Sequence, residues 1–200
     1  MLFFVLSTTF LFLGSGVSLL LAIGGYVSLP MSFIFIALAG SGNGYFLWNK
    51  LSQQQKNLLK RRFNLGLFAG ALATAAYDGS RFILCKLFFP ALSPFKAFPF
   101  FGKLIFPAAG NELAWAVGSV YHCINGLSFA VAYAIGFSGK PVIYAVLYAF
   151  FLEVLMLIVY PDVLDLSKVL EEFTIVSMTG HFFYGLVLGQ TCKNLKVENT

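Results

Sequence analysis

The chain has 200 residues, of which 59% are hydrophobic, 18% aromatic and only 10% charged, and its mean hydropathy is +0.84. A water-soluble domain of this length does not carry so few charges, so the composition indicates an integral membrane protein with no separate soluble domain. The formal charge is +5, but the 13 Lys and Arg residues are spread along the chain. This spread disfavours nucleic-acid binding and favours a role in membrane orientation.

Six apolar segments, bounded by charged residues, Pro or Gly, are long enough to cross a bilayer as helices. They lie at about 2–23, 31–49, 63–88, 113–136, 142–161 and 173–192. The sequence therefore predicts an all-α integral membrane protein with about six transmembrane helices in one bundle. The first segment lacks a basic region before it, so we interpret it as a retained helix rather than a cleaved signal peptide.

Basic residues predict the orientation in the membrane. They gather in the link after the second segment, in the link after the fourth and in the tail: Lys50, Lys56, Lys60, Arg61, Arg62, Lys140, Lys193 and Lys196. Cytoplasmic links are enriched in Lys and Arg, so this side is predicted to be cytoplasmic. Both termini then lie on the cytoplasmic side of a plasma or inner membrane. Five further basic residues on the opposite side reduce this asymmetry.

The chain is predicted to form a single polytopic membrane domain. Two peripheral helices lie within 1–49, a basic cytoplasmic link at 50–62, four core helices within 63–192 and a cytoplasmic tail at 193–200. The last four helices form the predicted core because only they carry ionisable residues that need a protein interior.

The link at 89–111, between the third and fourth helices, combines four Pro with six Phe residues. The prolines exclude a continuous helix across the link, and the Phe side chains make it too apolar for open water. We expect it to lie in the membrane interface. It would act either as an aromatic anchor or as a lid or lateral gate over a site between the helices.

Five ionisable residues fall inside the predicted core helices: Asp78, Arg81, His122, Glu153 and His181. Such groups are costly in hydrocarbon, so they usually face the bundle interior and serve a function. At 1.5 Å per residue, the two acids and the two histidines fall at a common depth within about 3 Å, one on each helix. The order acid, His, acid, His also hints at a repeat of two helix pairs.

Each of these four groups lies on the small-residue face of its helix. Their neighbours at four-residue intervals are Gly66, Gly70 and Thr74 for Asp78, Gly118 and Gly126 for His122, Ala145 and Ala149 for Glu153, and Ser177, Gly185 and Gly189 for His181. Residues four apart share a helix face, and close helix contacts in lipid favour small residues. We therefore expect all four groups to point into the bundle.

Two imidazoles and two carboxylates can perform acid–base catalysis, and they are also a ligand set for Zn²⁺ or Fe²⁺. We predict Asp78, His122, Glu153 and His181 as the catalytic residues of a membrane-embedded enzyme that acts on a lipid or other hydrophobic substrate. The same four residues are the predicted ligands if a metal is bound.

Four more residues are predicted to bind the substrate. Arg81 lies about one turn nearer the outer surface than Asp78, where it can pair with a phosphate or carboxylate head group. Tyr77, Asn125 and Tyr184 stand next to, or three residues beyond, the ionisable groups and can supply hydrogen bonds.

Three other functions stay open. A proton-coupled or cation transporter would use the same titratable layer, although few polar residues lie on its cytoplasmic side. A b-type haem between His122 and His181 would explain two histidines at one level but would leave the two acids without a role. In a purely structural membrane subunit, the polar groups would only satisfy one another.

Overall fold

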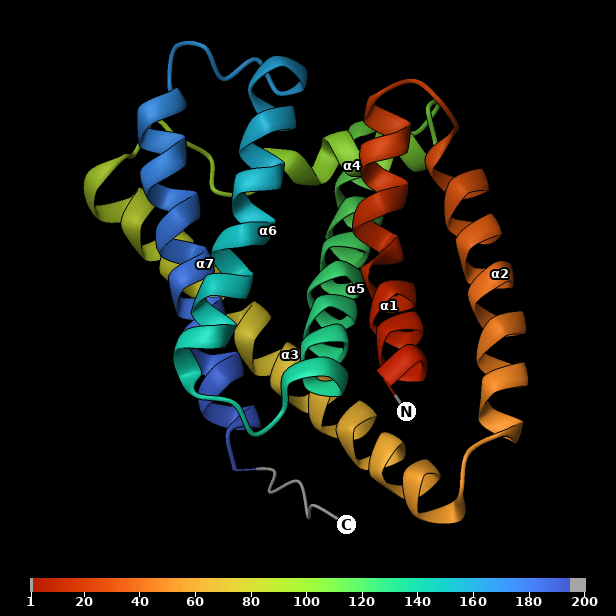
Figure 1. Cartoon of the computed structure of the whole chain (residues 1–200). Coiled ribbons are helices and arrows are strands. Elements are labelled where there is room, and N and C mark those ends of the chain that lie inside the picture. The colour runs from red at the N-terminus through yellow and green to blue at the C-terminus, as the bar shows by residue number, and fades with distance from the viewer. Residues whose placement is uncertain (1, 195–200) are drawn as a thin grey trace.

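The computed structural model describes residues 2–194, and within this range the chain folds into helices without any strand. Seven helices follow one another in Figure 1: α1 (Leu2–Ile23), α2 (Leu29–Asn49), α3 (Gln53–Phe88), α4 (Ala97–Ile105), α5 (Asn111–Phe137), α6 (Val142–Val163) and α7 (Leu170–Cys192). The all-helical prediction is confirmed. Six helices correspond to the six predicted segments, and α4 is an addition.

Three of the described helices, α2, α5 and α6, are long and apolar enough to cross a membrane. In α1, the stretch Leu11–Ile23 is apolar but shorter. Helices α3 and α7 begin with polar or charged residues, among them Lys56 and Arg61 on α3 and Glu171 and Glu172 on α7, which lowers their apolar character. Large apolar side chains such as Phe35 on α2 and Ile158 on α6 are exposed, as expected for helices that contact lipid chains. The fold thus fits integration into a membrane.

Helix α3 begins at Gln53 rather than at 63, so most of the basic link predicted at 50–62 is helical. Ser52 and Gln55 form a capping box: the Ser52 hydroxyl accepts from the Gln55 backbone N–H at 3.3 Å, and the Gln55 side chain accepts from the Ser52 backbone N–H at 3.0 Å. The Gln, Lys, Leu and Arg residues that follow are good helix formers. An apolar pattern alone does not reveal this polar extension.

The Pro-rich link contains the short helix α4, which the sequence did not predict. Pro99 lies in the first turn, where its missing N–H costs no helical hydrogen bond. Pro107 follows the last helical residue, Ile105, and cannot continue the helix. The prolines therefore limit the length of a helix in this link but do not prevent one.

Helix α4 packs along α5 with direct backbone contact. A Cβ added to Gly102 of α4 would overlap the backbone of Ala114, and one added to Gly118 of α5 would overlap the backbone of Phe98. The side chain of Phe101 is buried in the same contact. This close packing favours a fixed cover over the core rather than a lid that opens.

The core is a chain of helix contacts in which α3 lies against α5 and α7, and α7 lies against α6 (Figure 1). Glycine allows the backbones to approach: a Cβ on Gly66 of α3 would lie 2.6 Å from Cα of Val131 on α5, and one on Gly185 of α7 would lie 2.6 Å from Cα of Val146 on α6. Small residues at helix contacts are typical of proteins in lipid. Helices α5 and α6 scarcely touch each other.

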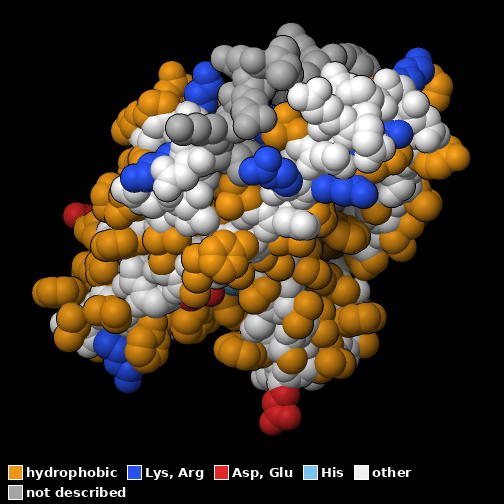
Figure 2. Space-filling model, turned by 90° about the horizontal axis from the view of Figure 1, so that it is seen from below, with side chains coloured by type: hydrophobic (Ala, Val, Ile, Leu, Met, Phe, Trp, Pro, Cys, Tyr) orange, Lys and Arg blue, Asp and Glu red, His pale blue; other side chains and the backbone are white. Residues whose placement is uncertain are grey.

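The first two helices pack on the outside of this core, α1 against α5 and α2 mainly against α1. In Figure 1, α1 begins and α7 ends towards the lower end, where the links α2–α3 and α5–α6 also lie. Figure 2 views this end and shows Lys and Arg side chains gathered on it. Of the predicted tail at 193–200, the part from 195 onward, including Lys196, lies outside the described residues.

Candidate functional site

Three ionisable residues of the predicted site meet around Tyr77 of α3. The Tyr77 ring lies against both imidazoles, with its centroid 5.7 Å from that of His122 on α5 and 4.8 Å from that of His181 on α7. The guanidinium of Arg81, one turn further along α3, lies over the same ring at 4.8 Å. Helix α3 therefore stands between the two histidines, and its tyrosine contacts both of them.

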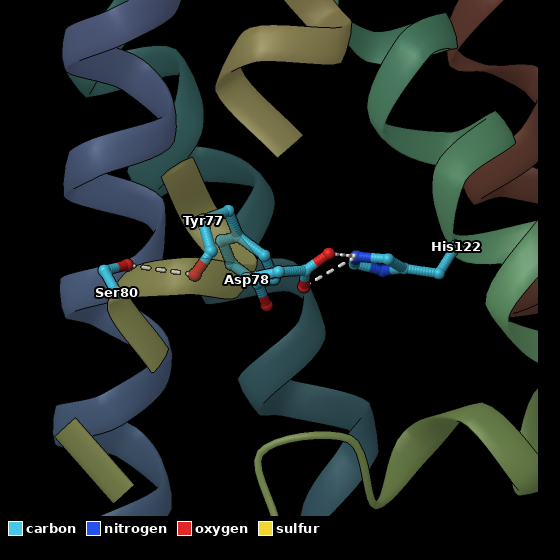
Figure 3. Close-up of polar contacts among 4 residues, drawn as sticks. All are labelled: Tyr77, Asp78, Ser80 and His122. Carbon is cyan, nitrogen blue, oxygen red and sulfur yellow. Dashed lines mark hydrogen bonds and ion pairs between the residues drawn. The ribbon is translucent and has the colours of Figure 1, made fainter. Parts of the chain in front are cut away.

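His122 is paired with Asp78. Its Nε2 lies 3.1 and 3.2 Å from the two carboxylate oxygens of Asp78 (Figure 3). An ionised carboxylate only accepts hydrogen bonds, so Nε2 carries the hydrogen and donates it. The two side chains are 17% and 26% exposed. The ring of Phe98 on α4 covers the imidazole at a centroid distance of 4.8 Å.

His181 is paired with Glu153 of α6. Its Nδ1 lies 2.9 Å from Oε2 of Glu153 and 3.1 Å from the carbonyl oxygen of Ser177. A backbone carbonyl can only accept, so Nδ1 carries the hydrogen. A neutral His181 then has its lone pair on Nε2, which is the tautomer of a histidine base oriented by a carboxylate. The Glu153 side chain is only 2% exposed.

The structure thus brings the two acids and the two histidines together as two acid–His pairs, not as one cluster. Within the described residues, no group of three or more His, Cys, Asp or Glu side chains is arranged to hold a metal ion. The shared Zn²⁺ or Fe²⁺ site predicted from Asp78, His122, Glu153 and His181 is not supported, because among the described residues each histidine contacts one acid and the two pairs do not join into a larger group. Both imidazoles pack on Tyr77, a geometry that does not favour a bis-His haem.

A cavity of about 70 Å³ lies between α5 and α6, bounded by α3, α7 and α4. It has room for a few water molecules. Its wall includes seven of the eight predicted site residues, namely Tyr77, Arg81, His122, Asn125, Glu153, His181 and Tyr184. Asp78 stands behind His122 and does not line the cavity. The rest of the wall is mainly apolar and aromatic.

Four buried polar atoms on this wall have no hydrogen-bond partner among the described residues: Nε of Arg81, Oε1 of Glu153, Oδ1 of Asn125 and Oγ1 of Thr74. All four residues are buried, Arg81 with 5% of its surface exposed. A buried polar group without a partner costs about 1–3 kcal/mol. The cavity therefore requires a polar occupant, either water or a ligand.

The aliphatic part of the Arg81 side chain packs against Gly180, the residue that precedes His181. A Cβ on Gly180 of α7 would lie 2.8 Å from Cγ and Cδ of Arg81 and 2.9 Å from the Tyr77 ring. The missing side chain at this position leaves the space in which Arg81 and Tyr77 lie against α7. No carboxylate of the described chain forms an ion pair with Arg81.

Two tyrosines close the cavity towards the α5–α6 link. The Tyr184 hydroxyl donates to the carbonyl of Gly126 at 2.6 Å, and the Tyr148 hydroxyl donates to the carbonyl of Phe129 at 3.0 Å. These bonds tie α7 and α6 to α5. The hydroxyl of Tyr184, a predicted substrate-binding residue, is thereby engaged in a contact between helices.

Thr74, Ser177 and Phe98 line the cavity but were not among the predicted site residues. Thr74 lies one turn before Asp78, so its spacing already placed it on the same helix face. Ser177 acts through its backbone carbonyl, which every residue has. Phe98 reaches His122 only because α4 forms. Ser177 lies four residues before His181, on the face that the spacing already indicated, whereas no signal in the sequence identifies Phe98.

No family model, no curated protein and no solved structure is found to match this chain.

Proposed function

We propose that the protein is a membrane-embedded enzyme that acts on a lipid or another hydrophobic substrate, with His181 and Glu153 as its acid–base pair. The observation that carries this proposal is the 2.9 Å contact between Nδ1 of His181 and Oε2 of the buried Glu153 carboxylate at the cavity wall, with Nδ1 also hydrogen-bonded to the carbonyl oxygen of Ser177. It leaves Nε2 of His181 to accept a proton from a substrate hydroxyl or a water molecule. Glu153 stabilises the imidazolium that forms.

The other wall residues have distinct roles in this proposal. His122, oriented by Asp78, stands on the opposite side of Tyr77 from His181 and can exchange a second proton with the substrate. Arg81 and Asn125 bind the polar end of the substrate. The apolar wall binds the first part of its chain and keeps bulk water away from the reacting groups.

We also propose that α1, α2, α3, α5, α6 and α7 cross a plasma or inner membrane, with both termini in the cytoplasm and α4 near the outer surface. The shared side of the α1 start, the α7 end and the links α2–α3 and α5–α6 supports this topology (Figure 1). The Lys and Arg side chains on that side support its orientation (Figure 2).

Transport and a purely structural role are less well supported. A carrier needs access to its site from both sides of the membrane, whereas the hydroxyls of Tyr148 and Tyr184 tie the helices together on the cytoplasmic side of the cavity. A structural network would satisfy its own polar groups. Here four wall residues each keep an unpaired buried atom.

The test compares total lipid extracts from cells that produce the wild-type protein, Glu153→Gln or Glu112→Gln. Glu112 is exposed at the start of α5 and serves as the matched control. We expect the wild type and Glu112→Gln to lower one lipid species and raise another, while Glu153→Gln changes neither. Identical lipid profiles for all three folded proteins and for cells that lack the protein would contradict the proposal.

A further inference from the structure

The buried guanidinium of Arg81 lacks a counter-ion. Its residue is 5% exposed, its Nε has no hydrogen-bond partner, and neither ion pair of the described chain includes it. The Tyr77 ring covers one face of the guanidinium but leaves the N–H groups in its plane unused. A buried charge without a partner is strongly unfavourable, so this group calls for an anion.

The polar atoms near Arg81 indicate which hydrogen-bonding groups must accompany that anion. Oε1 of Glu153 and Oδ1 of Asn125 are unpaired acceptors, so they need hydrogen-bond donors. The Thr74 hydroxyl, also unpaired, can donate or accept. Water supplies donors but no negative charge. An anionic head group, with its own hydroxyl or a bound water molecule as the donor, satisfies all four residues.

The residues around the cavity indicate the size and the apolar part of the ligand. A cavity of about 70 Å³ accommodates a small head group, not a large sugar. Phe129 of α5 and Leu152 and Met156 of α6 line the same cavity, and the two helices scarcely touch each other. The apolar chain of a ligand would therefore lie among these side chains, between α5 and α6.

We infer that the cavity binds the oxyanion head group, a phosphate or carboxylate, of a single-chain amphiphile, with Arg81 as its binding residue and the chain between α5 and α6. This inference names the substrate class of the proposed enzyme and rests on that proposal for its link to catalysis. Binding itself requires no turnover.

The test is a binding titration of the purified full-length protein in a neutral detergent. The probes are dodecyl phosphate and dodecanoate, with dodecanol, dodecyltrimethylammonium and inorganic phosphate for comparison. We expect saturable binding of one or both anionic amphiphiles and binding at least about ten-fold weaker for the three comparison probes, because each lacks either the charge, its sign or the chain. Equal binding of dodecanol would overturn the role of the anion, and equal binding of inorganic phosphate would overturn the role of the chain.

Variants connect the binding to Arg81. Arg81→Gln should weaken binding of the anionic amphiphile by at least about ten-fold, and Arg81→Lys should weaken it less, because Lys keeps the charge without the planar fork. Arg61→Gln removes an exposed charge from the same helix and should leave binding unchanged. Equal weakening by Arg61→Gln and Arg81→Gln would overturn the assignment.

A further variant keeps the test decisive if Arg81→Gln does not fold. Glu153→Gln removes a negative charge from the cavity wall, so it should strengthen anion binding, and weaker binding would overturn the inference. The outcome also separates the two proposals. Binding that depends on Arg81 without any lipid conversion would leave this inference standing and refute the enzyme, whereas conversion with binding independent of Arg81 would do the reverse.

Discussion

One oxygen of the Glu153 carboxylate lies 2.9 Å from Nδ1 of His181, while the other, Oε1, is buried at the cavity wall and has no hydrogen-bond partner among the described residues. The two oxygens of this carboxylate therefore have different environments. The carbonyl oxygen of Ser177 fixes the tautomer of His181, and Oε2 lies where it can stabilise the imidazolium. Oε1 can accept a hydrogen bond from a water molecule or a ligand in the cavity. A carboxylate in a purely structural contact would use both oxygens.

The glycine beside Arg81 gives a first prediction. Gly180→Ala should lower the free energy of unfolding by about 1–3 kcal/mol, because the new methyl group would displace Arg81 or Tyr77. The measurement is thermal unfolding in detergent. Gly79→Ala on α3 is the control, since a Cβ there meets nothing within 4 Å. Equal melting temperatures for the two variants would contradict the packing described at Gly180.

The division into two pairs predicts a pattern of energetic coupling. A double-mutant cycle with Asp78→Ala and His122→Ala should give a coupling free energy of about 0.5–3 kcal/mol, because the two side chains share hydrogen bonds. A cycle with Asp78→Ala and His181→Ala should give a smaller value. Both cycles use unfolding free energies in detergent. A stronger coupling across the pairs would indicate one connected cluster.

Substitution of Tyr184 distinguishes a structural role of its hydroxyl from a role in substrate binding. Tyr184→Phe leaves the Gly126 carbonyl without its hydrogen bond, so stability should fall by about 1 kcal/mol while the KM for the lipid substrate stays unchanged. Tyr144→Phe, at an exposed position on α6, is the control and should change neither. A raised KM at unaltered stability would instead support the substrate-binding role predicted from the sequence.

The proposed topology predicts which links can be labelled from outside the cell. In a variant without its three native cysteines, Ser167→Cys in the α6–α7 link should react with a membrane-impermeant thiol reagent on intact cells, and Lys140→Cys in the α5–α6 link should react only after permeabilisation. Both positions are exposed. Labelling of Lys140→Cys on intact cells would contradict the orientation with both termini inside.

Much of the helix layout could be predicted, because a membrane span requires an apolar segment of a certain length. The prediction ended α3 correctly at Phe88 but missed its start at Gln53, since the added turns are polar and depend on the cap formed by Ser52. It missed α4 because prolines were taken to exclude a helix. Pro99 occupies the one part of a helix that tolerates it.

The site shows a similar limit. Helix rise and the four-residue spacing of small residues predicted a common depth and an inward face for Asp78, His122, Glu153 and His181. They could not give the pairing, because periodicity says nothing about which helices become neighbours. The contacts of α3 with α5, and of α6 with α7, allow each acid to meet the histidine of the neighbouring helix.

The most direct test of the central claim is lipid conversion by the purified protein in vesicles made from the lipids of the producing cells, followed over time by mass spectrometry. The account predicts that the wild type converts one anionic lipid species, and that Glu153→Gln and His181→Ala slow this conversion by about 10²–10⁴-fold, because both remove the acid–base pair. Conversion at the wild-type rate by Glu153→Gln, or no conversion by the wild type, would contradict it.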